Sequence, residues 1–303
     1  MTSAHAHVVT VLPASAVVLH SALNALHYFF MTASEGKTTL CSGDDYIRHF
    51  DPNIYLRDYY FNKAIDESDL EPFVMSKQHN FYTKTAHFQP DSASVLEFGG
   101  GATVSHLISA TPYASSIVLA DYTPACLHVI DQWRKAPSKT EQLRDWTSHF
   151  RYIVQNLEMN DDDEAPKQRE SQLKVKLSSL VPCNILDDKP LGNDDYDKRF
   201  DVVSSSFCLE VACRTRAQFK LSVKKLVGLL RGSGSWLVLS CVLGEDSYPV
   251  GEKVFFTLSL TEDVVKEALE EAGLRLVDFE SIPLRLKEEN MATAACHAVG
   301  QLK

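Results

Sequence analysis

The sequence predicts an α/β fold, in which a mostly parallel sheet carries helices on both of its faces. Buried, β-prone runs alternate with segments of helical period through most of the chain after residue 92. The first run, 94–98, leads through Glu97 into three consecutive glycines, and apolar residues at helical spacing follow them. A strand, a glycine-rich turn and a helix start place backbone N–H groups against a ligand. Strands that alternate with helices imply a parallel sheet with right-handed crossovers.

The other elements are predicted from the same patterns, in chain order. Further strands are predicted at 117–120, 150–155, 181–186, 200–207, 236–243, 274–282 and 292–299. Helices are predicted from the glycine-rich turn to about Ala110 and at 124–135, 138–146, 172–180, 216–230 and 261–273. Ser138 and Glu141 form a capping box, and Gly273 is a helix stop signal. The charged stretch 159–170 has no apolar period and is predicted to be a solvated loop.

A helical unit is predicted upstream of the sheet, over residues 41–88. Ser42, followed three residues later by Asp45, is a helix N-cap signal. Six aromatic residues then lie among charged residues between Tyr46 and Phe61. Two interpretations are open: a helix pair that docks its aromatic side chains on the core, or a lid whose tyrosines close over a bound ligand.

Residues 1–40 differ in composition from the rest of the chain. The stretch 8–31 is mostly apolar and long enough to span a membrane, but Pro13 and several polar residues interrupt it. It lacks the positive n-region of a signal peptide and the arginines of a mitochondrial presequence. We interpret residues 1–40 as a poorly ordered apolar extension, with a membrane anchor as the alternative. Met31 begins a stretch that is typical of the N-terminus of a soluble protein.

Composition and charge narrow the function classes. The 303 residues are enough for one large α/β domain, and 30 basic against 40 acidic residues give a net charge of −10. This balance argues against a nucleic-acid surface, which requires clustered Lys and Arg. The seven cysteines form no CxxC pair and have no metal-ligand spacing with the eleven histidines. We therefore expect reduced cysteines, no metal, and a monomeric cytoplasmic protein.

Two kinds of cofactor compete for the glycine-rich turn. A dinucleotide fingerprint, G-x-G-x-x-G, requires glycine at 104, where valine stands, and the absence of GKS or GKT excludes a P-loop. S-adenosylmethionine needs no phosphate cradle, and acids at the ends of the first two strands, Glu97 and Asp121, suit it. Asp121 lies 22 residues after Gly99, and its carboxylate can accept both ribose hydroxyls of either cofactor. The missing third glycine therefore favours S-adenosylmethionine, with an NAD-linked oxidoreductase as the alternative.

Several sequence pieces occur together in a fixed order. They are Tyr46-Ile47-Arg48-His49-Phe50-Asp51-Pro52, Tyr55-Leu56-x-x-Tyr59-Tyr60, the glycine-rich turn, Asp121-Tyr122, Cys208-Leu209-Glu210-x-Ala212-Cys213, Leu229-Leu230-Arg231-x-x-Gly234, Tyr248-x-x-Gly251-Glu252 and Glu267-Ala268-x-x-x-Ala272-Gly273. In these pieces the chain from about Asp45 resembles the family of nicotinamide, phenylethanolamine and indolethylamine N-methyltransferases. The resemblance implies a Rossmann-like class I methyltransferase fold with a mostly parallel seven-stranded sheet. It also implies one methyltransferase domain over 41–303, with a helical lid at 41–88 and an α/β core at 92–303.

The resemblance assigns cofactor contacts position by position. Tyr55 and Tyr60 match lid tyrosines that contact the cofactor, and Asp121 matches the acid that binds ribose. The full set is Tyr55, Tyr60, Glu97, Gly99, Gly101, Thr103, Asp121, Tyr122, Cys126, Asn184, Ile185 and Ser206. Asn184 departs from the family's Asp beside adenine. It keeps a carbonyl acceptor but loses the charge, so we expect a weaker or altered adenine contact.

The substrate side departs from the nicotinamide branch. Cys241 stands where that branch has an Asp that recognises the substrate's amide, so nicotinamide is disfavoured. Glu245 falls where the phenylethanolamine branch places a carboxylate that handles the reacting amine, with a plain exposed loop acid beside Asp246 as the alternative. The residues expected to line the same pocket are Tyr59, Phe207, Cys241, Tyr248 and Thr257.

The sequence thus predicts an S-adenosylmethionine-dependent N-methyltransferase of a small, biogenic or arylalkylamine-like amine. Collinear placement of nitrogen, methyl and sulfur provides most of the acceleration. A protonated alkylamine has no lone pair, and a carboxylate at Glu245 would attract the ammonium and accept its proton. The alternatives are a catalytically relaxed, regulatory protein that binds the cofactor, and a methyltransferase of the same fold with a thioether or pyridine acceptor. No nucleic acid is expected as a partner, and no stable membrane association unless 8–31 is an anchor.

Overall fold

The protein is described here from a computed structural model, over residues 40–61, 64–65, 68–136, 145–284 and 292–303. Within these ranges, no helix combines the length and the apolar character that crossing a membrane requires. The extension predicted at 1–40 lies outside the described residues except for Leu40. Of the capped helix predicted at 138–146 only Asp145 and Trp146 are described, and neither is helical.

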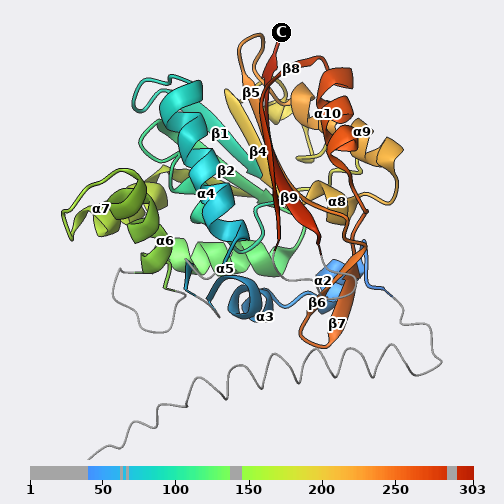
Figure 1. Ribbon diagram of the computed structural model, residues 1–303, viewed down its shortest axis with the longest axis horizontal. Coiled ribbons are helices and arrows are strands. Elements are labelled where there is room, and N and C mark those ends of the chain that lie inside the picture. The colour runs from blue at the N-terminus through green and yellow to red at the C-terminus, as the bar shows by residue number, and fades with distance from the viewer. Residues whose placement is uncertain (1–39, 62–63, 66–67, 137–144, 285–291) are drawn as a thin grey trace, which may run out of the picture. The chain divides into compact units, whose positions relative to one another are not determined.

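One seven-stranded sheet forms the centre of the fold (Figure 1). Its strands are β1 (Ala93–Phe98), β2 (Ala114–Asp121), β3 (Leu177–Pro182), β4 (Val202–Ser206), β5 (Trp236–Leu243), β8 (Leu274–Pro283) and β9 (Ala294–Leu302), in the spatial order β3-β2-β1-β4-β5-β9-β8. Strands β1 to β5 are mutually parallel, whereas β9 runs antiparallel to β5 and β8. The predicted mostly parallel, seven-stranded sheet is therefore confirmed. The strand order reverses between β1 and β4, and the crevice outside their carboxyl ends is the usual ligand site of such sheets.

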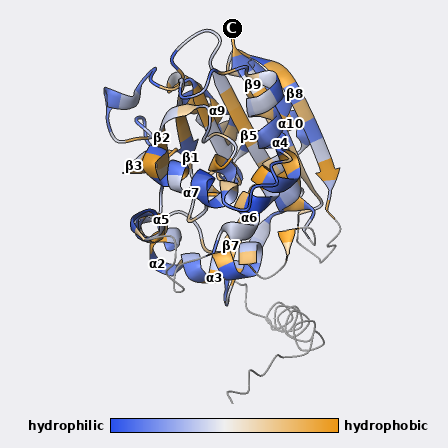
Figure 2. Ribbon diagram, turned by 90° about the vertical axis from the view of Figure 1, so that its left-hand side faces the viewer, coloured by the Kyte–Doolittle hydropathy of each residue, from blue (hydrophilic) through white to orange (hydrophobic). Residues whose placement is uncertain are grey.

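Helices cover both faces of the sheet. The α-helices are α2 (Asp45–His49), α3 (Pro52–Leu56), α4 (Leu70–Asn80), α5 (Pro124–Lys135), α6 (Thr147–Arg151), α7 (Ala165–Lys176), α8 (Leu209–Ala212), α9 (Arg216–Gly228) and α10 (Glu262–Glu271). Val95 and Ile117 face a hydrophobic cluster with α4, α5 and α7, while Leu96 and Val118 face a second cluster with α9 and α10. Figure 2 shows hydrophobic colour gathered on the strands between these helices. The core therefore lies in two layers, one on each side of the sheet.

The segment after the glycine-rich turn does not form the helix predicted to about Ala110. It forms a single 3₁₀ turn, Ser105–Leu107, followed by hydrogen-bonded turns up to β2. The amide of Ala114, the first residue of β2, already donates to the carbonyl of Ala110 at 2.9 Å. The chain must reverse within a few residues to enter β2, so there is no length for a regular helix.

The prediction of a strand at 150–155 is wrong. These residues lie in α6 and in the π-helical turn Tyr152–Leu157 that continues it. Phe150, Ile153 and Val154 are buried, and their spacing of three and four is that of one helix face. A short apolar run does not separate a strand from a helix by composition, and here its burial period identifies the helix.

The charged stretch 159–170 is also only partly a loop. Helix α7 begins at Ala165, and the third strand follows it at 177–182 rather than at 181–186. This helix buries Pro166 and Leu173 only, so its apolar period is weak. Ion pairs hold it instead: Arg169 pairs with Glu158 at 2.8 Å.

A two-stranded hairpin, β6 (Ser247–Val250) and β7 (Lys253–Phe256), was not anticipated from the sequence pattern. Cys41 adds to it, because its amide donates to Val254 at 2.8 Å and its carbonyl accepts from Phe256 at 3.0 Å. The start of the predicted lid is thereby joined to the hairpin that follows β5.

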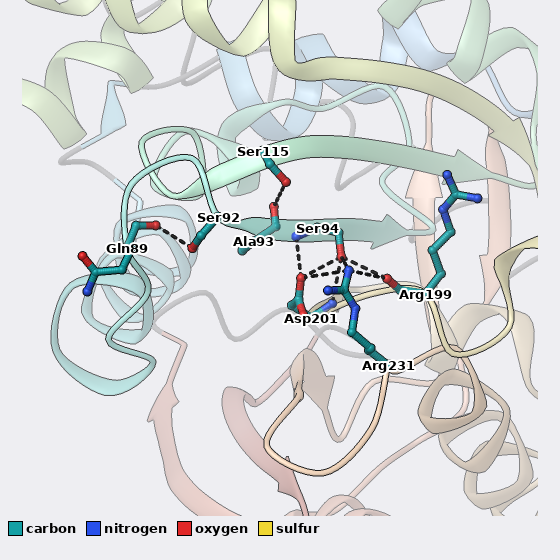
Figure 3. Close-up of polar contacts among 8 residues, drawn as sticks. All are labelled: Gln89, Ser92, Ala93, Ser94, Ser115, Arg199, Asp201 and Arg231. Carbon is teal, nitrogen blue, oxygen red and sulfur yellow. Dashed lines mark hydrogen bonds and ion pairs between the residues drawn. The ribbon is translucent and has the colours of Figure 1, made fainter.

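The amino ends of β1 and β4 are fastened by a polar cluster (Figure 3). The Asp201 carboxylate accepts hydrogen bonds from the amide and the hydroxyl of Ser94, both at 2.8 Å. Arg231 donates to the Ser94 hydroxyl at 3.0 Å and lies 3.4 Å from Asp201. This edge of the sheet is closed by side chains that satisfy one another.

Candidate active site

The glycine-rich turn after β1 needs its glycines for two different reasons. Gly99 and Gly101 have positive φ angles of 71° and 60°. A Cβ at Gly99 would lie 2.0 Å from the Sγ of Cys208, whereas a Cβ at Gly101 would meet nothing within 4 Å. The backbone therefore packs tightly on one side and borders open space on the other, which leaves room for a ligand at Gly101.

Asp121, at the end of β2, joins the turn to α5. Its Oδ2 accepts from the amide of Gly101 and its Oδ1 from the amide of Thr123, each at 2.8 Å. Burial raises the pKa of Asp121 to about 6, against the lowering effect of these bonds and of the Cys126 thiol. Each oxygen keeps further lone-pair capacity, so the carboxylate can accept two hydroxyl donors from a ligand.

Two lid tyrosines meet the turn. The Tyr55 and Tyr60 rings lie 5.8 Å apart, and hydrogen bonds link the Tyr60 hydroxyl to Tyr55 and to Thr103. Burial raises the pKa of both tyrosines, and the charge of Glu71 raises them further. The fold thus brings the neighbouring tyrosines Tyr55 and Tyr60 to Thr103, which lies much further along the chain. Tyr60 also belongs to the hydrophobic core, as expected if this segment docks its aromatic side chains there.

The predicted adenine positions lie beyond the ends of β2 and β3. The Tyr122 hydroxyl donates to Asp44 at 2.8 Å, which ties this position to the start of the lid. The Asn184 carbonyl oxygen accepts from the Leu186 amide at 3.1 Å, and its amide group donates to Asp187 at 3.0 Å. Asn184 therefore shapes its own turn, while the neighbouring Ile185 is buried.

Glu245, after β5, is buried. Its exposed fraction is 7%, so the interpretation as an exposed loop acid is wrong. Burial raises the pKa of Glu245 to about 8, and the charges of Glu210 and Asp246 add to the shift. No Lys or Arg pairs with Glu245 among the residues that the structure describes, so its site is suited to a cation from a ligand.

Glu210, on α8, is a second buried acid that was not singled out from the sequence. It is fully buried, its Oε1 accepts from the Val242 amide at 2.9 Å, and its Oε2 has no hydrogen-bond partner. Burial raises the pKa of Glu210 to about 7, and a bond from the Cys241 thiol opposes the rise. The only sequence signal was its place within Cys208-Leu209-Glu210, because its contact with β5 is a tertiary one.

Three tyrosines cluster near these acids, and we call Tyr46, Tyr59 and Tyr248 the aromatic enclosure. The hydroxyls of Tyr46 and Tyr248 lie 2.8 Å apart, and the Tyr59 hydroxyl donates to the Pro249 carbonyl at 2.7 Å. The Tyr59 and Tyr248 rings are 6.3 Å apart, and the charge of Glu245 contributes to the raised pKa of Tyr59. Tyr59, from the helical segment before β1, and Tyr248, from the hairpin, thus lie side by side, and Glu245 lies close enough to Tyr59 to raise its pKa.

The remaining predicted positions lie along the carboxyl edge of the sheet. Thr257 is buried and its hydroxyl has no hydrogen-bond partner. The Thr257 amide donates to the backbone carbonyl of Asp246 at 2.9 Å. Ser206 is buried at the end of β4, where the Gln78 amide donates to its hydroxyl at 3.4 Å. Phe207 follows with a φ of 56°, an uncommon conformation for an aromatic residue. Strain of this kind collects at functional sites.

Glu97 is the acid that ends β1, and it is almost fully buried. The Ser204 hydroxyl donates to its Oε2, while its Oε1 has no hydrogen-bond partner. In the described part of the chain, no group of three or more His, Cys, Asp or Glu side chains is arranged to hold a metal ion. The candidate site therefore combines a glycine turn, a carboxylate at the end of β2 with spare acceptor capacity, a group of tyrosines and two buried acids.

The chain is similar in sequence to a known protein family. The model of the NNMT/PNMT/TEMT family matches residues 37–299. Indolethylamine N-methyltransferase of Mus musculus is 28% identical over 255 residues, 84% of this chain and 92% of its own. Nicotinamide N-methyltransferase of Homo sapiens is 29% identical over 80% of this chain and 88% of its own. Phenylethanolamine N-methyltransferase of Sus scrofa is 25% identical over 77% of this chain and 81% of its own.

The fold also matches a solved structure of low sequence identity. Magnesium protoporphyrin IX methyltransferase from Synechocystis, with bound S-adenosylmethionine, superimposes with a TM-score of 0.52 at 11% identity. The match covers 86% of this chain and 94% of that chain.

Proposed function

The chain belongs to the NNMT/PNMT/TEMT family and is an S-adenosylmethionine-dependent N-methyltransferase of small molecules, and we propose that its acceptor is a small alkylamine, biogenic or arylalkylamine-like. The proposal depends on a pair of buried acids, Glu210 and Glu245, which lie next to the aromatic enclosure. Among the described residues, neither acid has a basic partner. Burying a carboxylate without a partner is costly, and a cationic ligand offsets that cost.

The residues around the turn fit the cofactor. We assign the glycine-rich turn, Thr103, Tyr55 and Tyr60 to its methionine end, because their backbone and hydroxyl groups converge beside the open space at Gly101. We assign Asp121 to the ribose hydroxyls, because its two oxygens keep free acceptor capacity. We assign Tyr122, Asn184 and Ile185 to the adenine of the cofactor. The Asn184 side chain is occupied by hydrogen bonds within its own turn, so Asn184 shapes the backbone there.

S-adenosylmethionine supplies a methyl group on a sulfonium, which is an excellent leaving group. The residues of this chain hold the amine in line and handle its proton. An alkylammonium must lose a proton before it can react, and Glu245 is placed to accept it. With a pKa of about 8 in the free protein, Glu245 ionises near the pH at which amines begin to release protons.

The lid and the hairpin complete the enclosure. Tyr59 from the lid bonds the hairpin backbone at Pro249, and Tyr46 bonds Tyr248. We propose that residues 41–88 act as a lid on the core at 92–303 and exclude water from the amine, which strengthens its attraction to Glu245. All seven cysteines are free, which supports a reducing, cytoplasmic environment.

Replacement of Glu245 tests the proposal. In Glu245→Gln we expect kcat for tryptamine and phenylethylamine to fall by about 100-fold or more, because the base is lost. Binding of S-adenosylhomocysteine, measured by calorimetry, should change less than about twofold. Asp246→Asn is the matched control: this neighbouring acid is exposed, and its loss should lower the pKa of Glu245 but leave kcat above about pH 8 unchanged.

The pH profile sharpens the same test. For the parent enzyme, kcat/KM with these amines should rise with pH through about 8 as Glu245 ionises. Full activity of Glu245→Gln would place the base elsewhere. Methylation of a thioether or a pyridine, but of neither amine, would contradict the proposed acceptor class. Binding of S-adenosylhomocysteine without transfer to any acceptor would indicate the regulatory alternative.

A further inference from the structure

Four buried titratable side chains form a row that the proposed chemistry does not use. The Glu97 Oε1 lies 3.7 Å from the His106 Nδ1, and the His106 Nε2 lies 3.9 Å from the Glu71 Oε2. The Glu71 Oε1 in turn lies 3.9 Å from the His149 Nε2. All four residues are less than 9% exposed. We call this alternation of acids and imidazoles the acid–imidazole row.

Four separate elements contribute the row. Glu97 ends β1, and His106 lies in the 3₁₀ turn that follows the glycine-rich turn. Glu71 lies in the first turn of α4, and His149 lies in α6. The row therefore runs from the cofactor turn to the helices behind the lid.

The charges in the row are not balanced by a basic residue. Among the described residues, no Lys or Arg forms an ion pair with Glu97 or Glu71. The Glu97 Oε1, the His106 Nε2, the Glu71 Oε1 and the His149 Nε2 each lack a hydrogen-bond partner. Two carboxylates buried in this way require a positive charge nearby. Among the described residues, the imidazoles of the row are the groups placed to provide it.

We propose that His106 is a positioning residue for methyl transfer, whose imidazolium lies between the Glu97 and Glu71 carboxylates and holds the glycine-rich turn to the start of α4. This inference rests on the proposed function only for the identity of the ligand at the turn. His106 contacts the turn through Glu97 and acts on the cofactor through it.

The carboxylates on either side of His106 favour the protonated form of its imidazole. Burial alone would lower the pKa of His106, but Glu97 and Glu71 together raise it above its usual value. Burial lowers the pKa of His149, and the charge of His106 lowers it further. His297, from β9, is held neutral by burial, with a pKa of about 3. We therefore place the positive charge of the row on His106, which lies between the two carboxylates.

The far end of the row reaches the lid. The His149 ring lies 4.8 Å from Trp146 and 6.3 Å from Tyr60, centroid to centroid. The charge of Glu71 contributes to the raised pKa of Tyr55 and Tyr60. A change in the charge of His106 is thus felt both at the turn and at the lid tyrosines.

The test separates charge from packing by a double-mutant cycle. His106→Gln leaves two carboxylates without a cation, so S-adenosylhomocysteine affinity should fall about tenfold by calorimetry. Glu71→Gln combined with His106→Gln restores the wild-type net charge of the row, and affinity should return to within about threefold. His79→Gln is the matched control. His79, on α4, is buried like His106, but it faces Ser109 and not the row.

Each outcome decides the proposal. If the double variant binds as weakly as the product of the single effects, or if His106→Gln binds like His79→Gln, the charge-based role is overturned. If His106→Gln fails to fold and the double variant folds and binds, the role is supported. If both fail to fold, His106 serves packing alone and the proposal is wrong. Failure of the proposed function would show separately, as wild-type protein that binds S-adenosylhomocysteine but methylates no amine.

Discussion

The two ends of strands β1 and β4 differ in how their polar groups are satisfied. At the amino ends, Ser94, Asp201 and Arg231 bond to one another within 3.4 Å (Figure 3). At the carboxyl ends, Glu97 keeps a buried oxygen without a partner, and so does Glu210 on the adjoining α8. Folded proteins rarely leave buried polar atoms unpaired, so this contrast supports our assignment of ligand binding to the carboxyl edge.

The same contrast appears in the titration of the acids. Asp121, Glu210 and Glu245, at the carboxyl edge, all have a pKa raised by burial. Raised acid pKa values of this kind collect where a protein binds or handles protons. We therefore assign stability to the amino edge and ligand binding to the carboxyl edge, although the same strands supply both.

The largest effect is expected at the glycine-rich turn. In Gly99→Ala the new Cβ would lie 2.0 Å from the Cys208 Sγ at a φ of 71°, so the turn must distort. We expect loss of S-adenosylhomocysteine binding by more than about 100-fold, together with a lower Tm. Adding Cys208→Gly to this variant should recover part of both losses, because the clash is removed.

Gly101→Ala is the matched comparison for Gly99→Ala. Its Cβ meets no protein atom, so only the left-handed backbone opposes it, at about 1–2 kcal/mol. We expect a Tm lower by a few degrees but a large loss of binding, because the methyl group enters the ligand space. Unchanged binding in Gly101→Ala would show that this space is not the cofactor's.

An intermediate effect is expected from pH, through Asp121. Only its ionised form can accept both ribose hydroxyls, and its pKa in the ligand-free protein is about 6. Affinity for S-adenosylhomocysteine should therefore be constant above about pH 7 and fall toward tenfold per unit below pH 6. Calorimetry between pH 5 and 8 measures this dependence. Asp121→Asn should bind weakly throughout and lose the pH dependence, and a pH-dependent Asp121→Asn would contradict the assignment.

The smallest effect on function is expected at the amino edge. Ser94→Ala removes a hydrogen bond to Asp201, so the free energy of unfolding should fall by about 1 kcal/mol. Cofactor affinity and kcat should stay within about twofold of wild type. Ser204→Ala, in the middle of β4 and opposite Glu97, removes the hydroxyl that donates to Glu97 and should weaken binding severalfold. Equal effects of the two variants on affinity would remove the distinction between the edges.

The bounds of a helix or strand were predicted correctly where neighbouring residues mark both its period and its ends. The strand 236–243 and the helix 124–135 have the same bounds in the structure, since the strand is a continuous apolar run and the helix starts at a proline. The segment 150–155 was misassigned because a short apolar run fits either structure. Only the packing of Phe150, Ile153 and Val154 on the core decides that it is helical.

The candidate site divides in the same way. The sequence by itself determined the glycine-rich turn, the acid at 121 and the tyrosine-rich segment, because turn geometry and strand ends are encoded by neighbouring residues. The tertiary structure decided that Glu245 is buried and that Glu210 faces the Val242 amide. It also decided the alignment of Glu71, Glu97, His106 and His149 in one row. Burial and charge balance depend on segments far apart in the chain, and no local pattern records which of them meet.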